Sequence, residues 1–468
     1  MAVCRLGGEA QRAGAASTAA RAFDAAVQFL RHFIRAGDAE AALAVEVAIY
    51  EFLVKGVEDE DHYERCFSRW RDEMAALARA NRIAVAASFP VSPRGVGFVF
   101  HNGVVLGHTE VLFRLLQFRD RDAIEPRIYS LAGCAPDFAA RARDLGVAID
   151  VFPERSRWAG PPQGYVPRLR WLQEAFTRNA DTTAVWMTTP VTSLFAFAMG
   201  IAPVQVFWSL RYHPVRLPEI DGYITYGSWG ESERTFHGQR WTVCPVPLAL
   251  ERRAIAPHEI AELHGRFPQK VLLGTLARPE KIASPAFLDC VARLLARHPE
   301  CGFLWTGQAR HAGIDAFFRD RGVAERCHFV GWVDTALFGA ARDVFLESFP
   351  LGCGITGYQA MAAGVPLVSF LDSNTVFGMR YWKEVVDRAG SRDAVSRELL
   401  DGYPVACART PDEYVEMASR MVTDRAFRSH WAAREAQFYA DEAGGTARYS
   451  ARFFDTIRAI AETTCSRS

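Results

Sequence analysis

The stretch LESFPLGCGITGYQAMAAGVPLV, residues 346–368, decides the fold. Its pattern predicts a buried strand, a glycine-rich loop, a helix that begins at Thr356, and a Gly-Val-Pro turn into a further strand. Glycines between a strand and a helix let the backbone approach a ligand closely, and the first free N–H groups of the helix point at that ligand. The stretch therefore predicts an anion-binding strand–loop–helix unit.

Strand and helix patterns alternate on both sides of this unit. Strand patterns lie at 83–85, 96–100, 127–130, 147–151, 184–188, 204–208, 222–225, 271–276, 301–306, 327–330, 344–346 and 367–370. Helical patterns between them lie at 110–118, 135–145, 169–178, 284–297, 314–321 and 356–363. This rhythm is typical of a parallel, doubly wound sheet, and it restarts after a proline-rich bridge at 244–259. We therefore expect an α/β protein with two Rossmann-like lobes and a ligand cleft between the carboxyl ends of their sheets.

The two ends of the chain have a different texture. Residues 22–81 carry apolar side chains at helical spacing and predict a small all-helical domain. The alanine-rich residues 1–21 lack the apolar segment of a signal peptide and predict a disordered lead-in. A tail helix at 446–464 has the length to cross back and strap one lobe to the other. The expected divisions are thus 1–21, 22–81, an N-terminal lobe at 82–250, a C-terminal lobe at 251–445 and a strap at 446–468.

Composition excludes several classes of function. The chain has 468 residues, 50% hydrophobic and 23% charged, which is a globular balance with length for roughly three domains. Its formal net charge of +0 gives no reason to expect nucleic acid or an anionic membrane as partner. No apolar run approaches the roughly 18 residues of a membrane span. The ten cysteines form no CxxC pair, which favours reduced thiols in a cytoplasmic protein.

A basic segment of the C-terminal lobe accompanies the glycine-rich loop. The strand VLLGTLA runs directly into Arg278-Pro-Glu-Lys281. A cation at the carboxyl end of a strand can face an anion site in the same lobe. A helix N-terminus and a lysine together can stabilise the charge that develops on a departing diphosphate. A solvated turn is the alternative interpretation of Arg278 and Lys281.

The sequence predicts no metal site. Asp120 and Asp122 have the spacing of a carboxylate pair, but their flanks predict a solvated helix end. We therefore expect neither a metal nor another cofactor, and we expect catalysis by positioning and electrostatics.

The C-terminal lobe resembles GT-B glycosyltransferases. Retaining enzymes of glycosyltransferase family 4 carry two glutamates across this loop and helix, where this chain has Leu351 and Gln359. The stretch is more similar to the inverting O-GlcNAc transferase family, glycosyltransferase family 41, which includes bacterial N-glucosyltransferases of adhesins. In that comparison Asp343-Val-Phe-Leu-Glu347 is the strand, and Gly354-Ile355-Thr356-Gly357 is the phosphate loop.

Other positions extend this resemblance. Lys281 resembles the phosphate-binding lysine of the family, and residues 202–225 are similar to the segment that leads out of the N-terminal lobe. Gln359 stands in place of a ribose-binding carboxylate, and Thr335 in place of a histidine that stacks on uracil. These departures leave the sugar and the base of the donor open.

Three histidines are candidates on the acceptor side. His101 and His108 lie in the first loop of the N-terminal lobe, and His213 lies in a later loop as Tyr-His-Pro. The family has a histidine near the place of His108, aimed at the reacting centre. His108 could orient the acceptor or sugar, or act as a base. The alternative is a helix-capping or core histidine.

The resemblance implies a metal-independent, inverting hexosyltransferase that moves a sugar from a nucleotide-sugar, UDP-linked, to a protein side chain. His108 is its candidate catalytic residue, and the candidate donor-binding residues are Arg278, Lys281, Gly352, Gly354, Ile355, Thr356, Gly357 and Gln359. The alternatives are transfer to a lipid-linked glycan or small metabolite, a nucleotide-sugar epimerase, and a non-catalytic scaffold.

Overall fold

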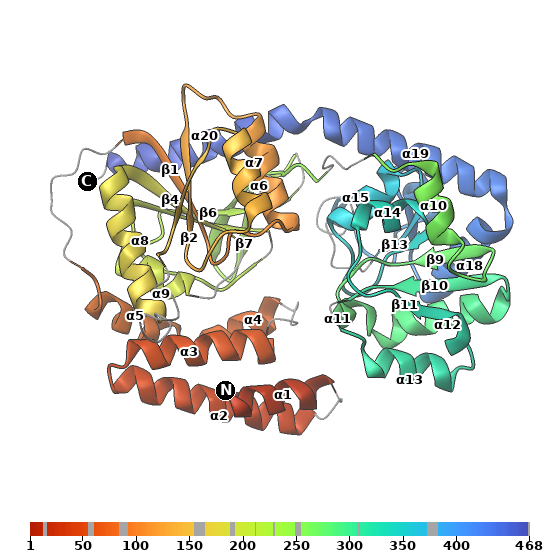
Figure 1. The fold of residues 1–468 in the computed structure, drawn as a ribbon, viewed down its shortest axis with the longest axis horizontal. Helices are drawn as coiled ribbons and strands as arrows, with labels where there is room; N and C mark the ends of the chain where they lie inside the picture. The colour runs from red at the N-terminus through yellow and green to blue at the C-terminus, as the bar shows by residue number, and fades with distance from the viewer. Residues whose placement is uncertain are drawn as a thin grey trace. The chain divides into compact units, whose positions relative to one another are not determined.

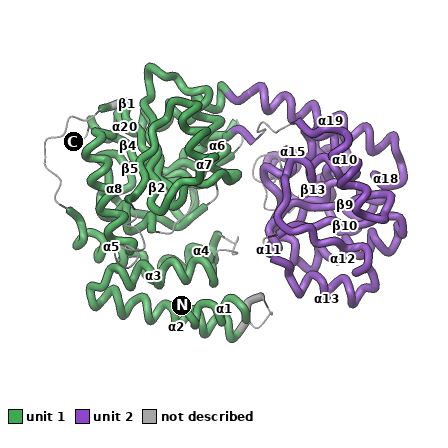
Figure 2. Tube along the Cα trace, viewed as in Figure 1, with its two compact units in different colours: residues 1–246, 447–468 green, residues 247–446 purple. Residues whose placement is uncertain are grey.

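The protein divides into two compact units, each built around its own sheet (Figure 2). The computed structural model describes residues 1–12, 16–54, 60–83, 92–153, 164–187, 192–210, 212–227, 230–248, 254–307, 309–371 and 382–466. Unit 1 comprises residues 1–246 and 447–468, and unit 2 comprises residues 247–446. The predicted α/β class with two Rossmann-like parts is confirmed.

Unit 1 contains an eight-stranded sheet with the order β3-β2-β1-β4-β5-β6-β8-β7 (Figure 1). Its strands are β1 (Ser92–Phe100), β2 (Glu125–Ser130), β3 (Ala148–Val151), β4 (Asp181–Met187), β5 (Val204–Ser209), β6 (Gly222–Thr225), β7 (Glu233–Phe236) and β8 (Gln239–Val243). All neighbours are parallel except β7 and β8. Every residue of β4, β5 and β6 is buried, as expected of parallel strands that are covered on both faces.

The hairpin of β7 and β8 was not predicted from the sequence. The two residues between its strands, His237 and Gly238, have φ angles of 46° and 77°. Positive φ at both central positions is what a two-residue type I′ turn requires. The short, partly exposed strands on either side carry too little apolar alternation to be recognised.

The C-terminal helix also belongs to unit 1. Beside the sheet lie α6 (Gly107–Gln117), α7 (Pro136–Asp144), α8 (Tyr165–Asn179), α9 (Ser193–Met199) and α20 (Thr446–Cys465). The Ser450 hydroxyl of α20 donates to the Leu115 carbonyl at 2.8 Å. The Phe453 ring lies 4.4 Å from the Trp208 ring of β5. The tail helix predicted from Thr446 therefore packs on the N-terminal sheet.

The N-terminal helices share the core of unit 1. They are α1 (Ala2–Arg12), α2 (Ala16–Arg35), α3 (Ala39–Ile49), the π-helix η1 (Tyr50–Val54), α4 (Glu60–Phe67) and α5 (Arg71–Ala80). The Glu40 carboxylate of α3 accepts the first N–H groups of α8, from Tyr165 at 2.7 Å and Val166 at 2.9 Å. A Cβ at Gly164 would lie 2.1 Å from Glu40, so this contact needs glycine. Residues 22–81 thus form one core with the N-terminal lobe.

The expected disordered lead-in at 1–21 is corrected by the structure. Helix α1 and the start of α2 occupy most of this segment. Cys4 is 3% exposed, and a Cβ at Gly7 would lie 2.6 Å from Ala22 and 2.7 Å from Leu53. The small residues that suggested disorder instead allow close helix packing.

Unit 2 contains a six-stranded, fully parallel sheet with the order β11-β10-β9-β12-β13-β14. Its strands are β9 (Val271–Gly274), β10 (Cys301–Trp305), β11 (Cys327–Phe329), β12 (Val344–Leu346), β13 (Leu367–Phe370) and β14 (Ala406–Ala408). Its helices are α10 (Pro257–His264), α11 (Pro279–Ile282), α12 (Pro285–Arg297), α13 (Ala312–Asp320), the 3-10 helix η2 (Ala324–Arg326), α14 (Thr335–Ala340), α15 (Ile355–Ala362), α16 (Lys383–Ala389), α17 (Arg397–Asp401), α18 (Pro411–Thr423) and α19 (Arg425–Gly444).

Several helices and one further strand of the two units were not predicted from the sequence. They are β14, α9, α10, α14 and α16 to α19. β14 has only three residues, too few to show a period. Most of the strand expected at 83–85 lies outside the described residues.

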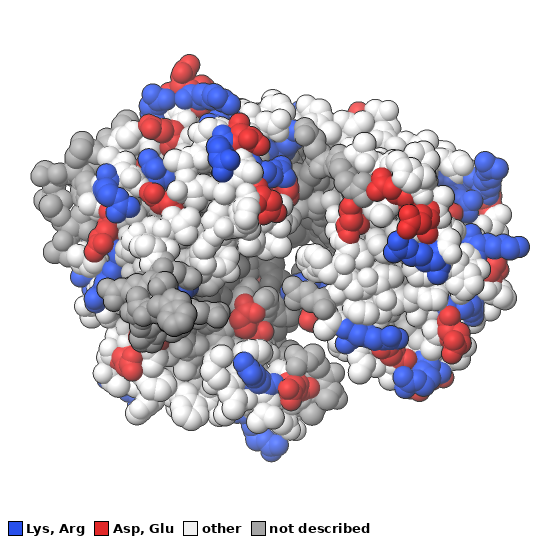
Figure 3. Space-filling model, in the orientation of Figure 1, with Lys and Arg blue, Asp and Glu red and all other residues white. Residues whose placement is uncertain are grey.

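The surface carries charges of both signs. On the face drawn in Figure 3, lysine and arginine are interspersed with aspartate and glutamate. Among the helices of the described ranges, none has both the length and the apolar composition that crossing a membrane requires.

Candidate functional site

The glycine-rich loop follows the carboxyl end of β12, which lies between β9 and β13 in the sheet of unit 2. The loop spans residues 347–354, and α15 begins at Ile355, one residue before the predicted start. Gly354 is the N-cap, and no side chain of the described residues caps this helix. The N-terminal turn of α15 therefore presents backbone N–H groups, which attract an anion.

The structure brings Lys281 to this loop. Helix α11 places Lys281 so that its Nζ donates to the Gly352 carbonyl at 2.7 Å, although the two residues are far apart in sequence. The positive charge thus lies against the backbone that leads into α15. Arg278 is the N-cap of α11, and its side chain is exposed.

Thr356 fixes the start of α15. Its hydroxyl donates to the Leu276 carbonyl at 2.9 Å, in the segment that follows β9. The hydroxyl proton is therefore committed to the backbone, which leaves the N–H groups of the loop as the donors that an anion could use. Gln359, one turn into the helix, has a buried Oε1 with no hydrogen-bond partner among the described residues.

A buried carboxylate underlies the loop. Glu347 is 0% exposed and accepts hydrogen bonds from the Cys353 thiol at 3.1 Å and the Ser369 hydroxyl at 2.5 Å. Burial, reinforced by Glu347, raises the pKa of Cys353 well above its ordinary value, so the thiol stays protonated and donates. In the sequence Glu347 marks only the end of a strand, because the residues that bury its side chain come from other segments.

The candidate histidines of unit 1 follow β1 and β5, two strands of the same parallel sheet. His108 is the second residue of α6, its ring stacks on the Phe100 ring with the centres 6.4 Å apart, and burial lowers its pKa to about 4. His101 is half-buried, and burial together with the charge of Arg168 lowers its pKa. Both imidazoles are therefore neutral at pH 7.

His213 lies in a packed environment. It is 4% exposed, its Nδ1 lies 2.6 Å from the Ser209 hydroxyl, and its ring meets Tyr63 of α4 edge-on. These contacts describe a core residue between β5 and the N-terminal helices. Its place on the acceptor side remains a prediction.

Replacing His108 with asparagine is expected to change how stability depends on pH. The unfolded chain takes up a proton near pH 6.5 and folded His108 only near pH 4, so wild-type unit 1 loses stability as the pH falls through this window. Removing the imidazole should abolish on the order of 3 kcal/mol of that loss. Urea unfolding between pH 7 and pH 4 measures it. His32→Asn, at an exposed position of α2, is the control; a pH dependence equal in His108→Asn and wild type would contradict the assignment.

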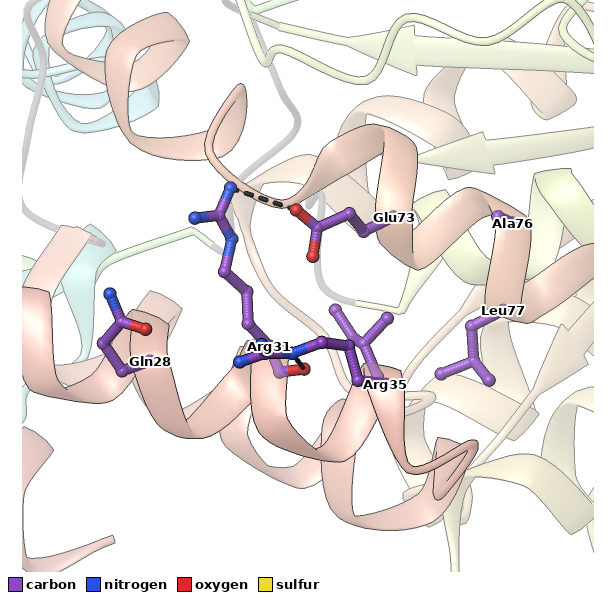
Figure 4. A pocket seen from close by; sticks show the side chains of 7 residues that line it. Gln28, Arg31, Arg35, Glu73, Ala76 and Leu77 are labelled. Carbon is purple, nitrogen blue, oxygen red and sulfur yellow. Dashed lines mark hydrogen bonds and ion pairs between the residues drawn. The ribbon is translucent and has the colours of Figure 1, made fainter.

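An open hollow lies away from all of these residues. It has a volume of about 530 Å³ and is bordered by α2 and α5, where Arg31 pairs with Glu73 at 3.0 Å (Figure 4). These helices carry none of the predicted site residues. Within the described ranges, no three His, Cys, Asp or Glu side chains form a group that could hold a metal ion.

Residues 268–381 match the family model described as "Glycosyl transferases group 1". This range contains β9, Lys281, the glycine-rich loop and α15. The chain is a glycosyltransferase. No protein with a curated description matches it significantly.

Solved structures share the fold of this glycosyltransferase. An O-GlcNAc transferase mutant of Thermobaculum terrenum is 18% identical to this chain, with a TM-score of 0.58. The matched region covers 98% of this chain and 89% of the chain of that structure. Anabaena Alr3699/HepE, in complex with UDP and glucose, is 13% identical with a TM-score of 0.56, covering 78% and 100%. A glycosyltransferase from Rickettsia africae is 9% identical with a TM-score of 0.52, covering 78% and 98%. The two sheet-containing units are those of the GT-B fold.

Proposed function

We propose that this glycosyltransferase moves a hexosyl group from a UDP-linked nucleotide-sugar to a protein side chain, with inversion and without a metal. The observation that carries the proposal is the contact between Lys281 Nζ and the Gly352 carbonyl, beside the uncapped N-terminus of α15. An ammonium group and a helix N-terminus at one loop suit a diphosphate leaving group.

Sugar transfer requires a group that stabilises the leaving diphosphate and a base that accepts the acceptor proton. The acceptor attacks the anomeric carbon, the bond between that carbon and the diphosphate oxygen breaks, and the diphosphate leaves with the electron pair. Lys281 and the loop N–H groups stabilise the charge that develops on it. The acceptor proton passes to a base, for which His108 is the candidate. His108 is neutral at pH 7 and able to accept a proton, although burial makes it a weak base.

Other observations support a UDP-linked donor, a protein acceptor and a cytoplasmic location. A structural neighbour holds UDP and glucose, and another is an O-GlcNAc transferase. Leu351 and Gln359 replace the glutamates of the retaining pattern, which favours inversion. All ten cysteines are free thiols, as expected in the reducing cytoplasm.

Incubation with single nucleotide-sugars and cell lysate tests this function. UDP-glucose, UDP-N-acetylglucosamine, UDP-galactose and GDP-mannose are compared, and intact protein masses are recorded. We expect a mass increase of one sugar on a lysate protein with a UDP-sugar, retained in EDTA. Labelled lipid or metabolite without labelled protein would contradict the protein acceptor, and epimerised donor without acceptor would identify an epimerase. Calorimetry that detects neither UDP nor GDP binding would indicate a scaffold.

A further inference from the structure

Arg342 is a buried cation of unit 2 that the mechanism above does not use. It lies between α14 and β12 and is 4% exposed. None of its three guanidinium nitrogens has a hydrogen-bond partner in the part of the chain that the structure describes. Burial lowers the pKa of Arg342 to about 9, so the group still carries its charge at pH 7. A buried charge without a partner is strongly unfavourable, so a partner is to be expected.

The fold makes room for this side chain. A Cβ at Gly274, the last residue of β9, would lie 2.6 Å from Arg342 Cδ. A glycine inside a strand marks such a close approach. The guanidinium carbon lies 4.6 Å from the centre of the Phe345 ring, a cation–π contact that uses a ring face but no N–H group.

Gly339 of α14 is near both the guanidinium and α15, the helix that begins at the glycine-rich loop. A Cβ at Gly339 of α14 would lie 3.9 Å from Arg342 Nη2 and 3.8 Å from the Gln359 carbonyl oxygen of α15. Two acidic residues of the segment around β12 have other partners. The Glu347 carboxylate accepts from Ser369 and Cys353, and the Asp343 carboxylate accepts from Leu272 N at 2.8 Å and lies 3.5 Å from His264 Nε2.

We propose that Arg342 is a second cation of the donor site and pairs with the diphosphate of the nucleotide-sugar when the donor binds. The inference rests on the proposed function, since it assumes that a diphosphate binds at this loop. A guanidinium offers paired N–H groups that match two oxygens of a phosphate, which an ammonium group cannot do. Lys281 and Arg342 would then both bind the diphosphate, and Lys281 would also donate to the Gly352 carbonyl.

A purely structural role makes the opposite prediction. If the cation–π contact with Phe345 is the reason for Arg342, its removal lowers the stability of the free protein and leaves ligand binding unchanged. If Arg342 awaits an anion, its removal takes away a buried unpaired charge, and the free protein melts at the same or a higher temperature while diphosphate binding weakens.

Calorimetry with UDP and with uridine, together with thermal melts without ligand, separates the two roles. The variants are Arg342→Met, which keeps an apolar side chain of similar length, and the control Arg319→Met at an exposed position of α13. We expect Arg342→Met to bind UDP about 10- to 100-fold more weakly than wild type. Its affinity for uridine should be unchanged, and its melting temperature should not be lower than that of wild type. Arg319→Met should behave as wild type.

Wild-type affinity for UDP in Arg342→Met overturns the inference. If wild-type protein binds neither UDP nor GDP, the proposed function fails first, and the two failures are thereby distinguished. Should Arg342→Met not fold, Arg342→Lys replaces it. That variant keeps the charge and loses the paired N–H geometry, so we expect a loss of about 3- to 10-fold, and unchanged UDP affinity overturns the inference in this variant also.

Discussion

Lys281→Ala is expected to lower sugar transfer by about 100- to 1,000-fold, the range found when one stabilising group at a developing negative charge is removed. Two effects combine. The charge beside the loop disappears, and the Gly352 carbonyl loses the donor that lies 2.7 Å away. The assay is the rate of transfer from the nucleotide-sugar that gives protein labelling, with circular dichroism and thermal melts to confirm that the variant is folded.

Lys270→Ala is the matched control. The chain has four lysines, and Lys270 is an exposed one that directly precedes β9 in the same unit. We expect its transfer rate to equal that of wild type. Lys281→Met keeps the apolar stem and removes both the charge and the donor, so its comparison with Lys281→Ala shows how much the packing of the stem contributes. A folded Lys281→Ala with the wild-type rate would remove Lys281 from the donor site.

Glu435→Ala is expected to lower the free energy of unfolding of unit 2 by about 3–5 kcal/mol, as for other buried side chains whose removal leaves a cavity and unpaired hydrogen-bond donors. Glu435 of α19 is 0% exposed. Its carboxylate accepts from Leu367 N at 2.7 Å and from Ala406 N at 3.1 Å. These N–H groups begin β13 and β14, so the variant leaves two buried donors and a cavity. Hydrogen exchange of β13 and β14 in rising urea measures the loss.

Two further variants bracket this result. Glu435→Gln keeps the volume but turns an amide NH₂ group towards one of the two donors, so we expect an intermediate loss of about 2 kcal/mol. Glu416→Ala removes an exposed partner of Arg297 on α18 and should change stability by less than about 0.5 kcal/mol. Unchanged exchange in Glu435→Ala would show that α19 does not secure these strands.

Sequence patterns predicted the elements whose signal is local. The helix of the glycine-rich loop was expected from Thr356 and begins at Ile355, because glycines before it and a Gly-Val-Pro turn after it delimit a short apolar helix. The tail helix was expected from Thr446 and begins there. By contrast, the sequence of α1 predicts disorder, because alanine and glycine suggest disorder unless a neighbouring helix packs against them.

The candidate site also contains residues that the sequence predicts and residues that only the structure reveals. The loop and the lysine segment were recognisable as separate pieces, and the family model covers both. Glu347 and Arg342 were not recognisable as site residues, because charged residues in the segments that flank a three-residue strand are typical of solvated turns. Their burial depends on Ser369, Cys353 and Gly274, which come from other segments. The roles of the three histidines remain predictions.

The sequence by itself determined that this protein alternates strands and helices in two sets, and that one of its loops can bind an anion. These properties follow from residue periodicity and from glycine and proline, which act within a few residues. Only the tertiary structure decided that Lys281 contacts Gly352, that the Glu347 carboxylate accepts from Ser369, and that the guanidinium of Arg342 is buried with no hydrogen-bond partner among the described residues. The physical reason is that strand order in the sheet brings distant segments together, and burial, not residue type, sets what a charged group must bind.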